Sequence, residues 1–509
     1  MNISRTEPAD LICNGTSAQC LRWICCGILV GVVAATFIPW LWSIDPWLIA
    51  STALGVFLFA IVFSDRRSIY FLFLAFLLLG VARFVTMLPH STTTAIDRRG
   101  VVQRVQPERF GAVSLVVDFG DAEKLLVRSV RGTFTYGDAV RVVCIPGMIE
   151  DIRGAPLDFS LASRGVFFEC AESRITLLDH NEGNPVFHAL YRFRDTLQRV
   201  THRFLSEPAS SLFSGILLGI QETIPTPLKQ AFVRTSLVHI LVVSGSHMVI
   251  LSEYLTLFFL LFGFSPRVRG ILTLVILFLF VASIGFPASA VRGLWFAVLL
   301  TLAMILGRMR VVTTALLGTA GIMILWNPFL IRDLGFQLSF LATIGIGIVA
   351  PRVELLWERF RAWLATWRSA PSAHKKRKKT WFHEVVLRPC VQFFSQTTFA
   401  TIGAIIMTAP LIASTFGQFS IVAPFANVIV LWILQPMMAL GIIFLLVAWV
   451  TPLAWIIASI LIALLQLIVI VVQFFGSFPF AQITMERSWM ISIVLYSVIF
   501  LWIRKSNPR

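Results

Sequence analysis

Polar and ionisable side chains interrupt three apolar stretches in the middle of this chain. They are Arg234, His239, Ser244, Gly245, His247, Ser289, Arg292, Asp333, Gln337 and Ser339. Such groups are costly inside a bilayer, so they usually face a cavity or a pathway. Glycines beside them, such as Gly245 and Gly285, allow helix breaks at which backbone N–H groups are free to bind an anion. We therefore expect broken helices to enclose a polar, positively biased passage between Phe204 and Ala350.

These residues also have a structural interpretation. His239 and His247 are eight positions apart, which is no metal-ligand spacing, and the alternative is a pair of histidines hydrogen-bonded to the backbone. Arg292 is alternatively the partner of a carboxylate such as Asp333 or Glu253. Gln337 and Ser339 are alternatively hydrogen-bonding groups between helices.

The elements around these residues are expected to be membrane-spanning helices. The 509 residues are 57% hydrophobic and 13% charged, which is too apolar for a soluble protein of this size. Many apolar runs approach the length of a bilayer span, for example Trp23–Trp42, Thr401–Phe416 and Ala423–Ala448. The first run is long and another follows at once, which does not fit a cleavable signal peptide. We predict an α-helical polytopic membrane protein with about twelve transmembrane helices.

The positive charge predicts the orientation of these spans. The net charge is +16, and nearly all of the excess lies in short basic segments between apolar runs and at the C-terminus. This is how the positive-inside rule distributes Lys and Arg, so the excess is not by itself evidence of a DNA partner. The rule places both termini and the loop 352–390, with Lys375–Lys379, in the cytoplasm. Residues from about 90 to 207 then lie outside, and four simple crossings follow the loop.

A small β domain is predicted between the early spans and the rest. Residues 89–182 contain short strand-like stretches separated by Gly-Asp turns, a pattern typical of a small Greek-key barrel such as an OB-fold. The domain is nearly neutral, so DNA binding there would need a local basic patch. Cys144 and Cys170 both lie in strand-like stretches, and an external location favours a disulfide between them. Two buried free thiols are the alternative.

An amphipathic helix is predicted in the linker at 183–207. Apolar side chains such as Phe187 and Phe204 share one face, and Arg192, Arg199 and Arg203 share the other. One interpretation is a helix on the outer membrane surface with its arginines toward lipid phosphates. The other is external DNA contact, in which the arginines guide a DNA backbone.

Three sequence blocks carry a family resemblance. They read GILLGIQETIPTPLKQAFVRTSLVHILVVSGSH at 215–247, GFPASAVRG at 285–293 and NPFLIRDLGFQLSFLATIGI at 327–346. In this order they resemble the core of the ComEC competence family, in which a His precedes Ser-Gly-x-His, followed by a Pro-Ser-x-x-Arg-like turn and Gly-Phe-Gln-Leu-Ser. The resemblance covers roughly 205–445 and implies that 208–509 is a competence-type transmembrane channel domain.

The resemblance also implies a function and partners. The family passes single-stranded DNA across the bacterial inner membrane during natural transformation, with a separate cytoplasmic ATPase and a separate DNA receptor or nuclease. Many members carry a metallo-β-lactamase-like domain with a His-x-His-x-Asp-His metal site, and this sequence has no such pattern. We therefore expect a non-enzymatic channel with no metal, cofactor or catalytic residues. The alternatives are a transporter of another polar or anionic solute on the same fold and a membrane enzyme.

Overall fold

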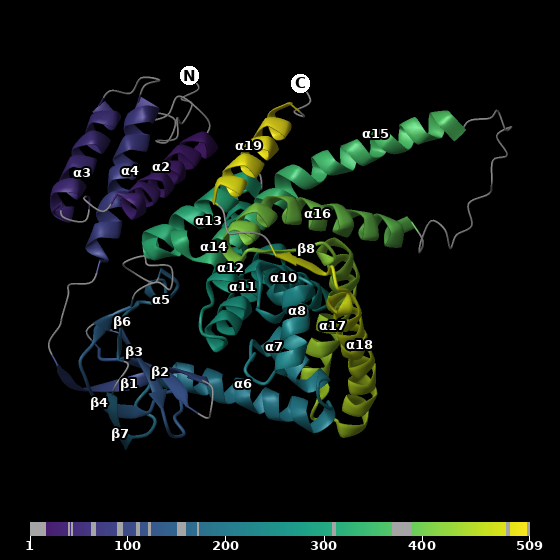
Figure 1. The fold of residues 1–509 in the computed structure, drawn as a ribbon, viewed down its shortest axis with the longest axis horizontal. Coiled ribbons are helices and arrows are strands. Elements are labelled where there is room, and N and C mark those ends of the chain that lie inside the picture. Colours follow the sequence, from purple (N-terminus) through teal and green to yellow (C-terminus); the bar gives the residue numbers. More distant parts are fainter. Residues whose placement is uncertain are drawn as a thin grey trace. The chain divides into compact units, whose positions relative to one another are not determined.

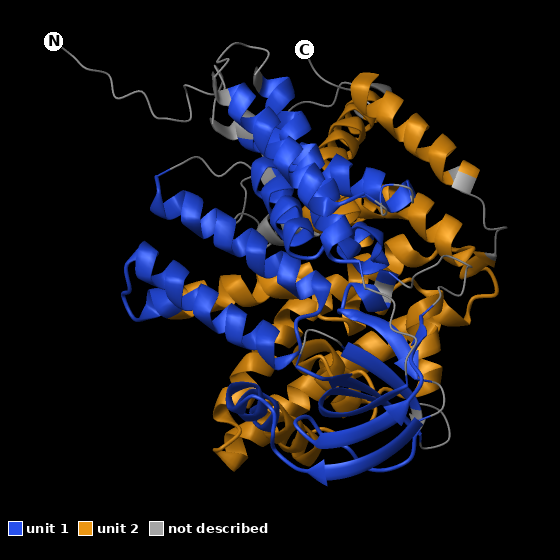
Figure 2. Ribbon diagram, turned by 90° about the vertical axis from the view of Figure 1, so that its left-hand side faces the viewer, with its two compact units in different colours: residues 1–193, 259–337 blue, residues 194–258, 338–509 orange. Residues whose placement is uncertain are grey.

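The computed structural model describes residues 17–38, 41, 44–62, 68–88, 95–107, 112–120, 124–149, 159–170, 173–307, 312–368, 388–484 and 489–505. These form two compact units, Met1–Phe193 with Phe259–Gln337 and Arg194–Phe258 with Leu338–Arg509 (Figure 2). The predicted domain 208–509 therefore contributes to both units. The basic cluster Lys375–Lys379 lies outside the described residues.

The first unit opens with three apolar helices, α2 (Ser17–Phe37), α3 (Pro46–Val62) and α4 (Ser68–Thr86). Glycines bring the backbones of α2 and α4 into contact, since a Cβ at Gly31 would lie 2.0 Å from the carbonyl oxygen of Leu77. A Cβ at Gly27 or at Gly80 would lie 2.6 Å from a carbonyl oxygen of the opposite helix. The Gly27-x-x-x-Gly31 spacing is a sequence signal for this packing, because small residues four apart let two membrane helices approach.

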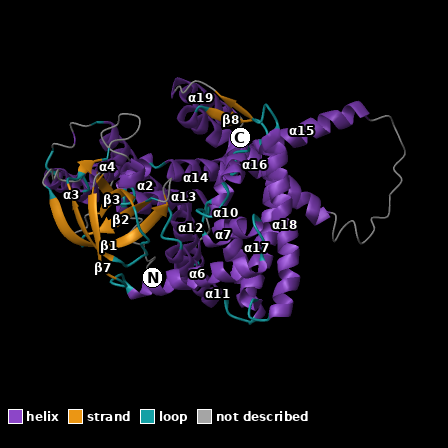
Figure 3. Cartoon of the chain, turned by 60° about the horizontal axis from the view of Figure 1, so that its bottom comes forward, coloured by secondary structure: helices purple, strands orange, loops and turns teal. Residues whose placement is uncertain are grey.

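A seven-stranded sheet follows α4 in the sequence. Its strands are the large group drawn in orange in Figure 3. Its strands are β1 (Ile96–Pro107), β2 (Val113–Asp118), β3 (Lys124–Val130), β4 (Ala139–Cys144), β5 (Gly147–Met148), β6 (Val166–Cys170) and β7 (Ser173–Asp179). Their spatial order is β5-β6-β3-β2-β1-β4-β7. Strand β1 pairs with β4 through its first half and with β2 through its second half. All pairs are antiparallel except β3 with β6.

Alternating side chains of these strands form the core of the sheet. Val102, Leu115, Val127 and Val142 are fully buried in one cluster, as expected for strands with one face turned inward. The sequence pattern predicts strands at Ala112–Asp118, Lys124–Val130 and Ala139–Ile145, which match β2, β3 and β4 to within one residue. It does not predict β1, whose run of Arg and Gln lacks alternation, and it predicts a single strand at Val166–Leu178, where the structure has β6 and β7.

The other helices of this unit are α5 (Phe159–Ala162), α11 (Pro266–Ser283), α12 (Ala288–Ile305), α13 (Val312–Trp326) and the 3-10 helix η3 (Pro328–Arg332). Three interactions bring helix ends to the sheet or to one another. Arg104 of β1 donates to the Gly285 carbonyl after α11 (3.2 Å), and Asn327 after α13 donates to the Ser163 carbonyl (2.6 Å). Arg83 near the end of α4 donates to the carbonyl at Leu325, in the last turn of α13 (2.8 Å). The ends of α4, α11 and α13 therefore lie on the side of the β domain.

The second unit is almost entirely helical (Figure 1). It contains α7 (Ala209–Leu218), α8 (Thr226–Arg234), α9 (Val238–Leu241), η4 (Gly345–Val349), α15 (Ala350–Arg368), α16 (Arg388–Phe416), α17 (Ala423–Val447), α18 (Thr451–Ser477) and α19 (Trp489–Lys505), with the two short strands β8 (Gln418–Ser420) and β9 (Gln482–Thr484). Helices α6 (Pro185–Phe204), α10 (Gly245–Leu261) and α14 (Leu334–Ile344) contribute to both units. A large apolar core joins α7, α8, α9, α17 and α18.

Helix α7 is buried at every residue and is only ten residues long. At 1.5 Å per residue it is about 15 Å long, roughly half of a hydrocarbon core. The positive-inside rule places the later basic loops in the cytoplasm only if Leu212–Ile220 does not cross the membrane, and the short length of α7 agrees with this.

Seven helical segments are long and apolar enough to cross a membrane. They lie in α4, α11, α12, the continuous segment Leu334–Leu364, α16, α17 and α18. Shorter apolar helices, including α2, α3, α10 and α13, accompany them in the described part of the chain. The protein is therefore mostly helical with a separate β region.

The end of α6 corrects the predicted topology. Phe204 packs on Phe444 and Trp455, with ring centroids 5.8 and 5.2 Å away, beside the turn between α17 and α18. If α16 to α19 crossed the membrane four times from a cytoplasmic loop, the turn between α17 and α18 would be cytoplasmic. An external α6 could not then pack against that turn. The predictions of an external α6 and of four simple crossings are therefore incompatible with each other.

Candidate functional site

The first motif block forms an interrupted helix in the second unit. Helix α8 ends at Arg234, the one-turn helix α9 follows, and Val242 is extended before α10 begins at Gly245. Ser236 adopts a positive φ of 56° at the first interruption. The backbone thus breaks at Ser244-Gly245, where the glycine and the serines of the motif indicated a break.

Ser244 and His247 form a helix cap at the start of α10. The backbone N–H of Ser244 donates to Nδ1 of His247 (3.1 Å), and the Ser244 hydroxyl lies 2.8 Å from the same nitrogen. Ser244 is the N-cap and His247 is N3, so the imidazole takes the place that Glu or Gln occupies in a capping box. Because a backbone N–H can only donate, Nδ1 carries a lone pair and the ring proton is on Nε2.

The other nitrogen of His247 has an unmet hydrogen-bonding capacity. The residue is 1% exposed, and within the described part of the chain Nε2 has no hydrogen-bond partner. His239, in contrast, is exposed, and its Nδ1 lies 3.1 Å from the carbonyl oxygen of Ser236. Each histidine therefore has a backbone hydrogen-bond partner. This is the arrangement described by the structural interpretation of His239 and His247.

The second motif block forms the turn between α11 and α12 in the first unit. Gly285 and Phe286 both have positive φ, 79° and 53°. The positive φ of Gly285 favours glycine, and the guanidinium of Arg104 lies close to it. Ser289 and Arg292 follow in the first turns of α12, are half-buried, and both engage in interactions with other residues.

The third motif block stabilises its own turn. The Asp333 carboxylate accepts the N–H of Phe336 (2.7 Å) at the start of α14, and the Gln337 side chain donates to the Ile331 carbonyl (2.7 Å). Asn327 accepts the N–H of Phe329 (3.1 Å) and so caps η3. These bonds show that Asp333 and Gln337 have local structural roles. Ser339 lies half-buried one turn further along α14.

The predicted path residues divide between the two units. Arg234, His239, Ser244, Gly245, His247 and Ser339 belong to the second unit, and Ser289, Arg292, Asp333 and Gln337 belong to the first. Arg234 is exposed and lines a cavity of about 290 Å³ between α8 and α18. In the described ranges, His, Cys, Asp and Glu form no group of three that is arranged to hold a metal ion.

Helix α6 carries the predicted arginine stripe. Arg192, Arg199 and Arg203 are exposed, whereas Thr201 and Phe204 are buried. Arg199 donates to the hydroxyl of Thr196 (2.9 Å), and Arg203 lies over the Phe204 ring at 5.5 Å. The helix therefore presents a basic face along its length.

A cluster that sequence reasoning missed lies just after α6. The Ser210 hydroxyl is 2.6 Å from Nδ1 of His202, and Glu207 lies 3.5 Å from the same nitrogen and accepts from Ser211 (2.6 Å). In a nucleophilic relay the serine and the carboxylate contact opposite ring nitrogens. Here they meet the same nitrogen, so the geometry favours a structural link between α6 and α7. Its only sequence signal is three polar residues before an apolar run.

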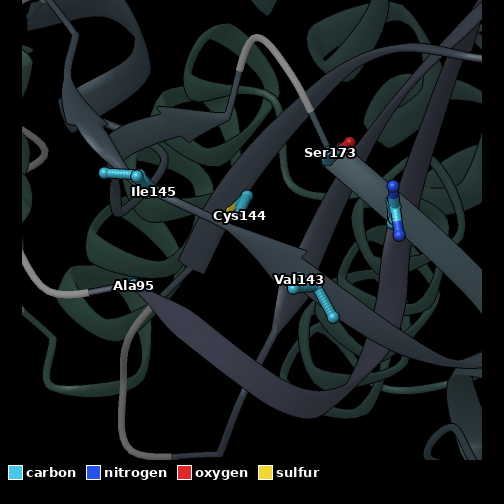
Figure 4. Close-up of a pocket in the computed structure, with 6 residues that line it drawn as sticks. Ala95, Val143, Cys144, Ile145 and Ser173 are labelled. Carbon is cyan, nitrogen blue, oxygen red and sulfur yellow. The ribbon is translucent and has the colours of Figure 1, made fainter.

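In the β domain the cysteine pair lies beside a shallow cavity. The Sγ atoms of Cys144 and Cys170 are bonded, with their Cα atoms 6.1 Å apart. Figure 4 shows Cys144 with Val143, Ile145, Ala95 and Ser173 around the cavity, whose volume is about 440 Å³. Val143 and Ile145 are exposed, so the cavity wall is mainly apolar. Arg174 is the one basic residue among its described lining residues, and none of them is aromatic, so it lacks the stacking surface of a single-strand binding groove.

Comparison with known proteins identifies the family. Residues 216–506, more than half of the chain, match the family model described as "Competence protein". The chain is also 26% identical over 147 residues to "ComE operon protein 3" of Bacillus subtilis (strain 168), a match that covers 29% of this chain and 19% of that protein. No solved structure matches. With its long apolar helices and its three motif blocks, the chain is a membrane protein that belongs to the Competence protein family.

Proposed function

We propose that this protein is a non-enzymatic inner-membrane channel that passes single-stranded DNA into the cytoplasm during natural transformation. The observation that carries the proposal is the family match over 216–506, which contains all three motif blocks. The interrupted helix from α8 to α10 supports it, because non-helical backbone at membrane depth is tolerated where it lines a cavity or is buried in protein.

The β domain and α6 provide the external approach in this proposal. The β1–β2–β3 meander, with β4 on β1 and β6 parallel to β3, agrees with an OB-like barrel. We assign the domain to the outside together with the ends of α4, α11 and α13, and the N- and C-termini to the cytoplasm. The exposed arginines of α6 then face the incoming phosphate backbone.

The proposed membrane domain has about ten spans, because a turn between α17 and α18 on the side of α6 leaves one crossing between the basic loop and that turn and one between that turn and the C-terminus. The long segments in α4, α11, α12, Leu334–Leu364, α17 and α18 and the shorter helices α2, α3, α10 and α13 would supply them. A separate cytoplasmic ATPase would drive transport, and a separate DNA receptor or nuclease would deliver the single strand.

Uptake of fluorescent DNA tests this proposal in transformable cells that lack their own copy of the gene. Replacing Arg192, Arg199 and Arg203 together with Gln is expected to reduce cytosolic entry of DNA at least about tenfold, because the loss of three phosphate contacts weakens backbone binding. The matched triple Lys variant keeps the charge and is expected to retain most of the uptake. Immunoblots of the membrane fraction check that each variant is present.

Normal cytosolic entry of DNA in the deletion strain would contradict the channel function. If the triple Gln and the triple Lys variants reduced cytosolic entry of DNA equally, an electrostatic role of α6 would be contradicted. The channel function would then be tested by the deletion strain alone.

A further inference from the structure

A cavity between α8 and α18 has the features of an anion site. It has a volume of about 290 Å³ and is lined by Gln230 and Arg234 of α8 and by Gln473 and Ser477 of α18. Gly476 also lines it and lies close to Ala231 of α8. Three of the four side chains bring N–H donors to one opening.

The guanidinium of Arg234 belongs to an exposed side chain. Among the residues that the structure describes, no carboxylate and no carbonyl accepts a hydrogen bond from it. The other charged residue of α8 is Lys229, so the helix has no acidic group of its own. An arginine fork with amide donors beside it suits the oxygens of a phosphodiester.

The surface that leads to the cavity is suited to hydrocarbon. Ile456, Ile460, Leu467, Ile470 and Phe474 of α18 are all exposed, and their spacing places them along one face. Their helix also has the highest mean hydropathy of the seven candidate spans, 3.0. A DNA strand would need donors along this face, whereas an acyl chain would not. The cavity therefore lies at the end of a lipid-facing stripe.

The position along α18 places the cavity at a headgroup level. Phe204 of α6 packs on Trp455 at the start of α18, and the cavity lies at Gln473–Ser477 at its end. The 27 residues of α18 extend over about 40 Å, the thickness of a bilayer with its headgroups. The basic surface helix α6 and the cavity thus lie at opposite faces of the membrane.

We propose that this cavity binds the phosphodiester of a glycerophospholipid, with Arg234 and Gln473 holding the phosphate and an acyl chain lying along Ile470 and Phe474. Arg234 then binds lipid and is not part of the DNA path predicted from the sequence, so the site is independent of the DNA channel. It tethers α8, and with it the start of the interrupted helix, to the leaflet opposite α6.

Native mass spectrometry of the detergent-purified full chain, titrated with dioleoyl phosphatidylglycerol, tests the site. Arg234→Gln is expected to weaken binding roughly tenfold, the effect of losing a charge-assisted hydrogen bond. Lys229→Gln, which makes the same change of charge on the same helix outside the cavity, is expected to change it less than about twofold. Gln473→Leu preserves the charge and the lipid-facing character of α18 and is expected to weaken binding about threefold.

A thymidine oligonucleotide provides the second probe. Equal losses in Arg234→Gln and Lys229→Gln, or no loss in Arg234→Gln and Gln473→Leu, would overturn the lipid site. A loss confined to oligonucleotide binding would assign the cavity to the DNA strand instead. If Arg234→Gln fails to fold, as judged by gel filtration, the Gln473→Leu result decides.

Discussion

The cap formed by Ser244 and His247 predicts that replacing His247 with Ala lowers the free energy of unfolding more than replacing it with Gln. Removing the imidazole by His247→Ala deletes the acceptor of two hydrogen bonds, from the N–H and the hydroxyl of Ser244. The two donors share the single lone pair of Nδ1, and leaving the Ser244 N–H without an acceptor costs about 1–3 kcal/mol. The side chain is 1% exposed, and the cavity left by Ala adds to this cost. A total near 2–4 kcal/mol is expected.

Gln at position 247 is the matched control. Its side-chain oxygen can accept the Ser244 N–H as in an ordinary capping box, so we expect His247→Gln to lose no more than about 1 kcal/mol. The assay is thermal unfolding of the purified protein in one detergent, followed by intrinsic fluorescence and compared as midpoints. Protonation of Nδ1 would also abolish its acceptor role, so acidification should lower the wild-type midpoint more than that of the Gln variant.

Two results would refute this reasoning. Equal destabilisation by Ala and Gln would mean that the imidazole acts through something other than the cap. Wild-type stability in His247→Ala would mean that the break before α10 needs no acceptor at this position. In either case the Ser-Gly-x-His motif would need another physical explanation.

Three further predictions concern the rest of the fold. Gly31→Ala should destabilise the protein by about 1–3 kcal/mol because its Cβ would overlap the backbone of α4, whereas Gly55→Ala, with nothing within 4 Å, should be neutral in the same unfolding assay. Reducing the disulfide of the β domain should lower its stability by about 3–4 kcal/mol through loop entropy, measured as the difference between oxidised and reduced midpoints. The pKa of Asp97 is lowered because Arg141 donates to its carboxylate, so the pair stabilises the fold above the ordinary carboxyl pKa and loses this effect as the pH falls through the lowered value. Carboxyl NMR titration should show the Asp97 pKa returning toward its usual value in Arg141→Gln, and an unchanged pKa would contradict the assignment.

Local sequence patterns predicted much of the framework. Apolar run lengths indicated the spanning helices, and alternation indicated β2, β3 and β4. The glycine at Ser244-Gly245 indicated a helix break. These properties depend on neighbouring residues, which is why sequence alone could determine them.

Long-range contacts decided the rest. Arg104 meets the Gly285 carbonyl and Asn327 meets the Ser163 carbonyl although 181 and 164 positions separate the partners. Strand β1 has no clear pattern of its own and is fixed by pairing with two strands. The position of Phe204 beside Trp455 overturned an alternation that charge counting favoured. Sequence by itself determined which segments are apolar, extended or interrupted, because these properties depend on the conformational and burial preferences of residues that are close in the chain. Only the tertiary structure decided which polar groups meet, because partners distant in the chain are selected by packing.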